Sequence, residues 1–134
     1  MSGAPDTSLS VLVASADPAI LDVAQRALLA VGDRPTSAMS VAEALATAQA
    51  ERYDVAFVDV SLDGDTGLAL VHHLRTLVHG LAVYVVASPK KVELATEGVS
   101  LGAAGILVTP LTGDALAQAA GEVRVRNVDT EKRR

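Results

Sequence analysis

The sequence contains no cysteine, and only 2% of its 134 residues are aromatic. Without cysteine the chain has no disulfides, no thiolate zinc sites and no cysteine nucleophile, and it is compatible with a reducing compartment. Because aromatic rings are so scarce, the core has to be built mainly from alanine, valine and leucine. This composition is typical of a soluble α/β protein.

Clustered positive charge and long apolar runs are also missing. The formal net charge is −5, and the basic residues are scattered apart from the pair Lys90 and Lys91 and the group at 132–134. A nucleic-acid groove needs clustered positive charge, usually with stacking aromatic residues, so we expect no direct binding of nucleic acid. We also expect no membrane association and a cytoplasmic location, because the sequence shows neither an apolar run of spanning length nor a signal-peptide pattern.

The chain has the length of one domain. Short apolar runs alternate with helical patterns, and this alternation is typical of a parallel sheet covered on both faces. The runs lie at 9–14, 35–38, 55–58, 81–86 and 106–108. We expect one domain over residues 9–125, an N-terminal tail over 1–8, and a C-terminal tail or linker over 126–134.

Helix starts and stops are well signalled. Asp17 and Pro18 begin a helix that Gly32 ends, and Ser40 and Glu43 have the spacing of a capping box. Gly98 lies inside the fourth helical pattern and predicts a loosely held helix. The expected helices span about 18–31, 41–50, 66–78 and 91–101, with a fifth from about 112.

Short right-handed connections favour a flavodoxin-like, doubly wound fold. The predicted strand order is 2-1-3-4-5, with the first and fifth helices on one face and the other three on the opposite face. Ligands of such sheets bind at the carboxyl ends of the strands, and Asp59 ends the third apolar run. Asp59 is therefore the candidate functional residue.

The alternation of strands and helices, Asp59, the loop at 63–67 and the segment 102–110 together resemble the receiver domain of bacterial two-component response regulators. The resemblance implies that Asp59 occupies the position that accepts a phosphoryl group from a sensor histidine kinase. It also implies a Mg²⁺ ion held by that aspartate, by the backbone carbonyl of Ser61 and by an acidic pair at the end of the first strand.

Four positions depart from the family pattern. The positions of the acidic pair hold Ser15 and Ala16. Ala87 replaces the Thr or Ser with which the family ends the fourth strand, and Thr109 replaces the lysine that precedes the proline after the fifth strand. Alanine offers a hard divalent cation no oxygen ligand from its side chain, so we expect no bound metal or other cofactor. The sequence therefore predicts a pseudo-receiver, not an enzyme, that acts as a phosphorylation-independent interaction module.

Other interpretations stay open. Asp59 is either a strand-end residue bonded to loop amides or a working phosphoacceptor whose metal and phosphate site has been rebuilt. The candidates for such a rebuilt site are Asp17, Asp63, Asp65, Ser88, Lys90 and Lys91. The chain is alternatively the N-terminal part of a longer regulator, and His72 and His73 are best interpreted as solvated residues.

The resemblance also implies an interaction surface made by the fourth helix, the fifth strand and the fifth helix. There Ile106, Pro110 and Leu111 are the candidate apolar contacts. The expected partners are signalling proteins, such as a histidine kinase or an output domain, or a second copy in a homodimer. The family also favours a cis bond between Thr109 and Pro110.

Overall fold

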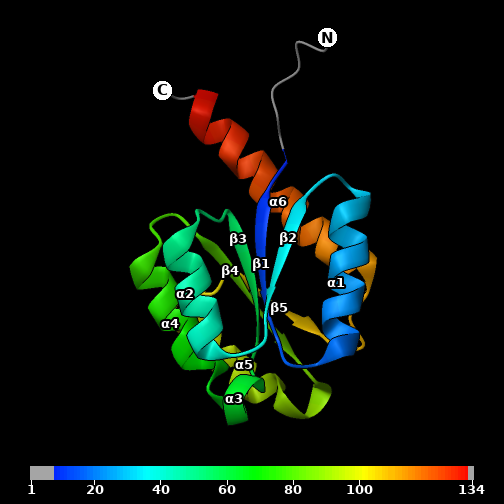
Figure 1. Ribbon diagram of the computed structural model, residues 1–134, viewed down its shortest axis with the longest axis vertical. Helices are drawn as coiled ribbons and strands as arrows, with labels where there is room; N and C mark the ends of the chain where they lie inside the picture. Colours follow the sequence, from blue (N-terminus) through cyan, green and yellow to red (C-terminus); the bar gives the residue numbers. More distant parts are fainter. Residues whose placement is uncertain (1–7, 133–134) are drawn as a thin grey trace.

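A five-stranded parallel sheet lies between two layers of helices (Figure 1). The structure is a computed structural model that describes residues 8–132, with side chains over 8–127. The strands are β1 (Ser10–Ala14), β2 (Arg34–Ala38), β3 (Val55–Asp59), β4 (Ala82–Ala87) and β5 (Gly105–Val108). The helical segments are α1 (Pro18–Ala30), α2 (Val41–Ala50), α3 (Leu62–Asp65), α4 (Gly67–Leu77), α5 (Val92–Ser100) and α6 (Gly113–Lys132), with a 3₁₀ turn at Pro89–Lys91.

The strand order is β2-β1-β3-β4-β5, which confirms the predicted topology. Two apolar cores cover the two faces of the sheet. On one face α1 and α6 pack over the strand residues Val11 and Phe57, and on the other α2, α4 and α5 pack over Leu12 and Val83. In the β1–β3 register Ala14 lies opposite Val58, so the residues that follow these two, including Asp59, meet at the carboxyl edge of the sheet.

The predicted helix caps are confirmed. An Asp17 carboxylate oxygen accepts a hydrogen bond from the Ala19 amide (2.9 Å), and the Ser40 hydroxyl accepts one from the Glu43 amide (3.0 Å). These bonds satisfy amides that the first turn of each helix leaves without a partner. Capping therefore sets where α1 and α2 begin.

Gly98 in α5 has a packing role, beyond the cost to helix formation on which the expectation of a loosely held helix rested. A Cβ at this position would lie 2.8 Å from Val85 Cγ2. The glycine therefore allows α5 to approach β4 closely.

The last helix, α6, continues past residue 125, where the sequence predicted that the domain ends. The segment assigned to a C-terminal tail or linker is helical over residues 126–132, and α6 projects past the edge where the strands begin (Figure 1). An ion pair between Arg124 and the buried Asp33 anchors this polar part of the helix, with Nη2 to Oδ1 at 2.5 Å. The expected N-terminal tail lies, except for Ser8, outside the described residues. Within the described part of the chain, no helix combines the length and apolar character needed to cross a bilayer.

Candidate functional site at the carboxyl edge of the sheet

Asp59 lies at the tip of β3 and is 8% exposed. Its Oδ2 accepts a hydrogen bond from the Ser15 hydroxyl (2.8 Å), and its Oδ1 accepts one from the Ser61 amide (2.9 Å). Both carboxylate oxygens are therefore engaged by the protein itself. The bond from Ser61 is the loop-amide contact that a structural role for this aspartate requires.

Ser15 connects three parts of the site. Its side chain is fully buried, its hydroxyl donates to Asp59, and the same oxygen accepts from the Asp17 amide (3.0 Å). One hydroxyl thus joins the end of β1 to the tip of β3 and to the start of α1. The sequence identified Ser15 as the position of a lost acidic ligand, but this bridging role depends on a rotamer that no sequence pattern reports.

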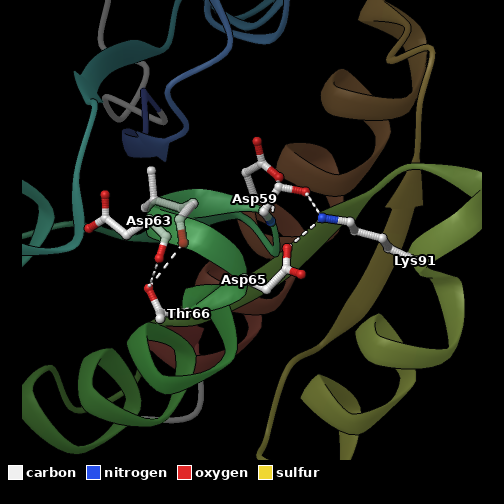
Figure 2. Close-up of polar contacts among 7 residues, drawn as sticks. Asp59, Asp63, Asp65, Thr66 and Lys91 are labelled. Atoms are coloured by element: carbon white, nitrogen blue, oxygen red, sulfur yellow. Dashed lines mark hydrogen bonds and ion pairs between the residues drawn. The ribbon is translucent and has the colours of Figure 1, made fainter.

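The loop after β3 has an unusual backbone. Asp63, Gly64 and Asp65 all have positive φ angles, at 52°, 71° and 70°. This turn aims the two aspartates in different directions (Figure 2). Asp63 Oδ2 accepts from the Val41 amide at the start of α2 (2.8 Å), so Asp63 serves as a second cap for that helix.

Lys91 reaches the same loop from the start of α5. Its ammonium group donates to the Ser61 hydroxyl (3.0 Å) and forms an ion pair with Asp65 (Figure 2). The charge of Lys91 is therefore matched by a loop carboxylate beside Asp59. Lys90 is exposed on the preceding turn.

A cleft of about 550 Å³ opens above Asp59. Its polar lining comes from Asp17, Asp59, Ser61, Ser88 and Thr109. The rest of its wall is apolar, formed by Ala16, Ala19, Ile20, Val23, Leu62, Pro110 and Leu111. Ala87 is 1% exposed and does not line the cleft. Of the four departing positions, the structure therefore brings Ser15, Ala16 and Thr109 to Asp59 or its cleft and leaves Ala87 in the core.

Comparison with known proteins identifies the family. A family model described as the response regulator receiver domain matches residues 11–121. The chain belongs to this family. It is 29% identical to the alginate biosynthesis transcriptional regulatory protein AlgB of Pseudomonas putida, over 96% of the chain and 29% of that protein. It is 30% identical to the probable transcriptional regulatory protein TcrX of Mycobacterium tuberculosis, over 78% of the chain and 44% of that protein.

Solved structures show the same receiver fold. The receiver domain of NtrX from Brucella abortus superposes with a TM-score of 0.79 at 25% identity, over 85% of this chain and 97% of that one. The chemotaxis response regulator CheY4 of Vibrio cholerae superposes with a TM-score of 0.78 at 27% identity, over 87% and 98%. The chain is thus a receiver domain of the two-component response regulator family, and it spans about three-tenths of the length of AlgB.

The carboxylates of the family's Mg²⁺ site are reduced in number in this receiver, because the acidic pair falls on Ser15 and Ala16. Magnesium prefers near-octahedral oxygen ligands with carboxylates among them. Over the described residues no three histidine, cysteine, aspartate or glutamate side chains gather at one point. Asp17, the other carboxylate that lines the cleft, is already used to cap α1.

The candidate contact residues of the receiver differ in exposure. Pro110 is exposed, and Ile106 is partly buried against the core. Leu111 is only 9% exposed and belongs to the core between the sheet and α1 and α6, so it offers a partner little surface. The peptide bond between Thr109 and Pro110 is cis, as the resemblance implied.

Proposed function

We propose that this receiver domain is a phosphorylation-independent protein interaction module of bacterial signal transduction, with no metal or other cofactor. The observation that carries the proposal is the bonding of Asp59. Ser15 occupies one of its oxygens and the Ser61 amide the other, while the nearby ammonium of Lys91 is paired with Asp65. The carboxylate is held as a structural acceptor at the tip of the sheet.

The chemistry of phosphoryl transfer supports the same conclusion. Such transfer depends on positioning and on charge stabilisation of the transferring group. Losing one preorganised electrostatic contact of this kind costs about 2.7–4 kcal/mol of transition-state stabilisation. At this site the acidic pair, the hydroxyl residue and the lysine are replaced by Ser15, Ala16, Ala87 and Thr109.

Direct phosphorylation tests this proposal. We expect no phosphorylated species when the purified chain is incubated with acetyl phosphate and Mg²⁺ and its intact mass is measured. An Asp59→Asn variant is the matched control, because it removes the acceptor atom and nearly preserves the shape. A phosphorylated species that is present in the wild type and absent from Asp59→Asn would establish the alternative, a working phosphoacceptor with a rebuilt site.

An exposed apolar surface supports the interaction role. Val99 and Leu101 at the end of α5 are 47% and 41% exposed, and Val108 on the edge strand β5 is 45% exposed. We call these three residues the α5–β5 surface. The helix α5 and the strand β5 contact each other, and exposed large apolar side chains on neighbouring elements are typical of protein contact sites. A second copy of the chain is the partner that this proposal commits to.

Self-association tests the α5–β5 surface. We expect the wild type to show concentration-dependent dimerisation in sedimentation velocity, and Val108→Asp to weaken it by at least about tenfold, because a charge buried at an interface is not compensated. Leu29→Asp is the control, since Leu29 is 55% exposed on α1, away from this surface. A wild-type chain that stays monomeric at all concentrations, or equal effects of both variants, would contradict a homodimer through this surface.

A further inference from the structure

A second and larger cleft lies at the opposite edge of the sheet, where the strands begin. Its volume is about 750 Å³. The segments that lead into β3, β4 and β5 form its floor, and the ends of α4 and α6 contribute to its walls. Figure 1 shows the end of α6 rising past this edge of the sheet. We call this site the basal cleft.

Positive charge converges on the basal cleft. Arg52 precedes β3, Arg75 comes from α4 and Arg126 from α6, and His79 adds an imidazole. The acidic residue of the lining is Asp54, whose Oδ2 already accepts a hydrogen bond from the Ser10 amide (2.9 Å). A chain with a net charge of −5 thus places three arginine residues from distant parts of its sequence around one cavity.

The guanidinium of Arg75 is held in place before any ligand arrives. Its Nη1 donates to the Leu81 carbonyl (3.1 Å). Gly102, with a φ of +107°, lies against it so closely that a Cβ at this position would be 2.8 Å from Arg75 Nε. The absence of a side chain at Gly102 therefore leaves room for the guanidinium. Of its five donors, Leu81 occupies one, and a fixed fork of this kind loses little entropy on binding an anion.

The arrangement favours phosphate over carboxylate. A carboxylate offers two oxygens in one plane and is matched by a single guanidinium fork. A phosphate group offers three oxygens at different angles and up to two charges, which suits donors that approach from several sides. The volume lies within the range of small-molecule sites, and the polar lining does not suit an apolar ligand.

We propose that the basal cleft binds a small phosphate-bearing anion. Such a ligand would connect α4 and α6 to the amino edge of the sheet. Arg126 and Asn127 line the cleft but lie beyond residue 121, where the match to the receiver family ends. The site is thus partly built from the part of α6 that follows the family match, and it is separate from Asp59.

Binding of inorganic pyrophosphate tests the proposal. We expect heat of binding in calorimetry at low ionic strength in metal-free buffer, and shifts of the Gly80 and Gly102 amide signals in NMR spectra without a shift of Gly67. Arg75→Gln and Arg52→Gln should each weaken binding by at least about tenfold, because each removes charge-assisted hydrogen bonds. Arg26→Gln is the control, since Arg26 lies on α1 with 80% of its side chain exposed.

The variants distinguish binding in the basal cleft from a folding defect and from non-specific binding. If Arg75→Gln loses its fold because the Leu81 contact is gone, Arg52→Gln still tests the cleft. The proposal is overturned if the wild type does not bind, if Arg26→Gln weakens binding as much as the cleft variants, or if succinate binds as tightly as pyrophosphate. Asp59→Asn should bind pyrophosphate with unchanged affinity, so a failure here leaves the proposal about Asp59 untouched.

Discussion

Replacing Gly67 with alanine should lower the free energy of unfolding by about 3 kcal/mol, because it overpacks a rigid contact. Gly67 begins α4, and a Cβ at this position would lie 2.3 Å from the Asp59 carbonyl oxygen and 2.8 Å from Val60 Cα. Both are backbone atoms of the buried strand and its exit, so no side-chain rotation relieves the clash. Urea unfolding followed by far-ultraviolet circular dichroism measures the loss.

Gly121→Ala is the matched control for this prediction. Gly121 lies inside α6, and a Cβ there would meet no atom within 4 Å. Alanine is the better helix former, so this variant should be more stable than the wild type by about 1 kcal/mol. Opposite signs for the two substitutions would show that close approach of α4 to β3, rather than glycine content, limits stability. A Gly67→Ala variant as stable as the wild type would contradict this packing.

Much of the fold could be predicted because its determinants are local. Apolar runs of strand length, the caps Asp17 and Ser40 and the chirality of crossovers together fix the strand order and the layers. Gly67 shows what this reasoning misses. A glycine in a loop suggests a turn, but its φ is not in the left-handed region, and the requirement comes from a helix that starts against a strand end.

Only part of the candidate site could likewise be predicted from the sequence. Position along the strands placed Asp59 and Ser15 at one edge of the sheet, as predicted. Sequence reasoning considered Lys91 as a substitute cation for the phosphoryl group, but could not see that the left-handed turn places Asp65 against it. The burial of Leu111 was missed for a related reason, since its environment is set by packing between the sheet and α1 and α6.

Restoring the family residues around Asp59 should make this aspartate a working phosphoacceptor. The variant carrying Ser15→Asp, Ala16→Asp, Ala87→Thr and Thr109→Lys should be phosphorylated on Asp59 by acetyl phosphate at least about a hundredfold faster than the wild type, because each preorganised contact contributes about that factor or more. The dependence on Mg²⁺ should appear with it. Intact mass against time measures the rate, and adding Asp59→Asn to the four substitutions should abolish the signal.

The same variant also gives a readout that does not depend on phosphorylation. Ser15 is fully buried, with its hydroxyl 2.8 Å from Asp59, so an aspartate at this position places two like charges together. Without metal this repulsion should destabilise the fold, and Mg²⁺ should reverse the loss by binding only the folded state. The wild type should show no change of melting temperature with Mg²⁺. If the wild type is stabilised by Mg²⁺ as strongly as the variant, then Asp59 already holds the ion, and the interpretation of this receiver as independent of phosphate is wrong.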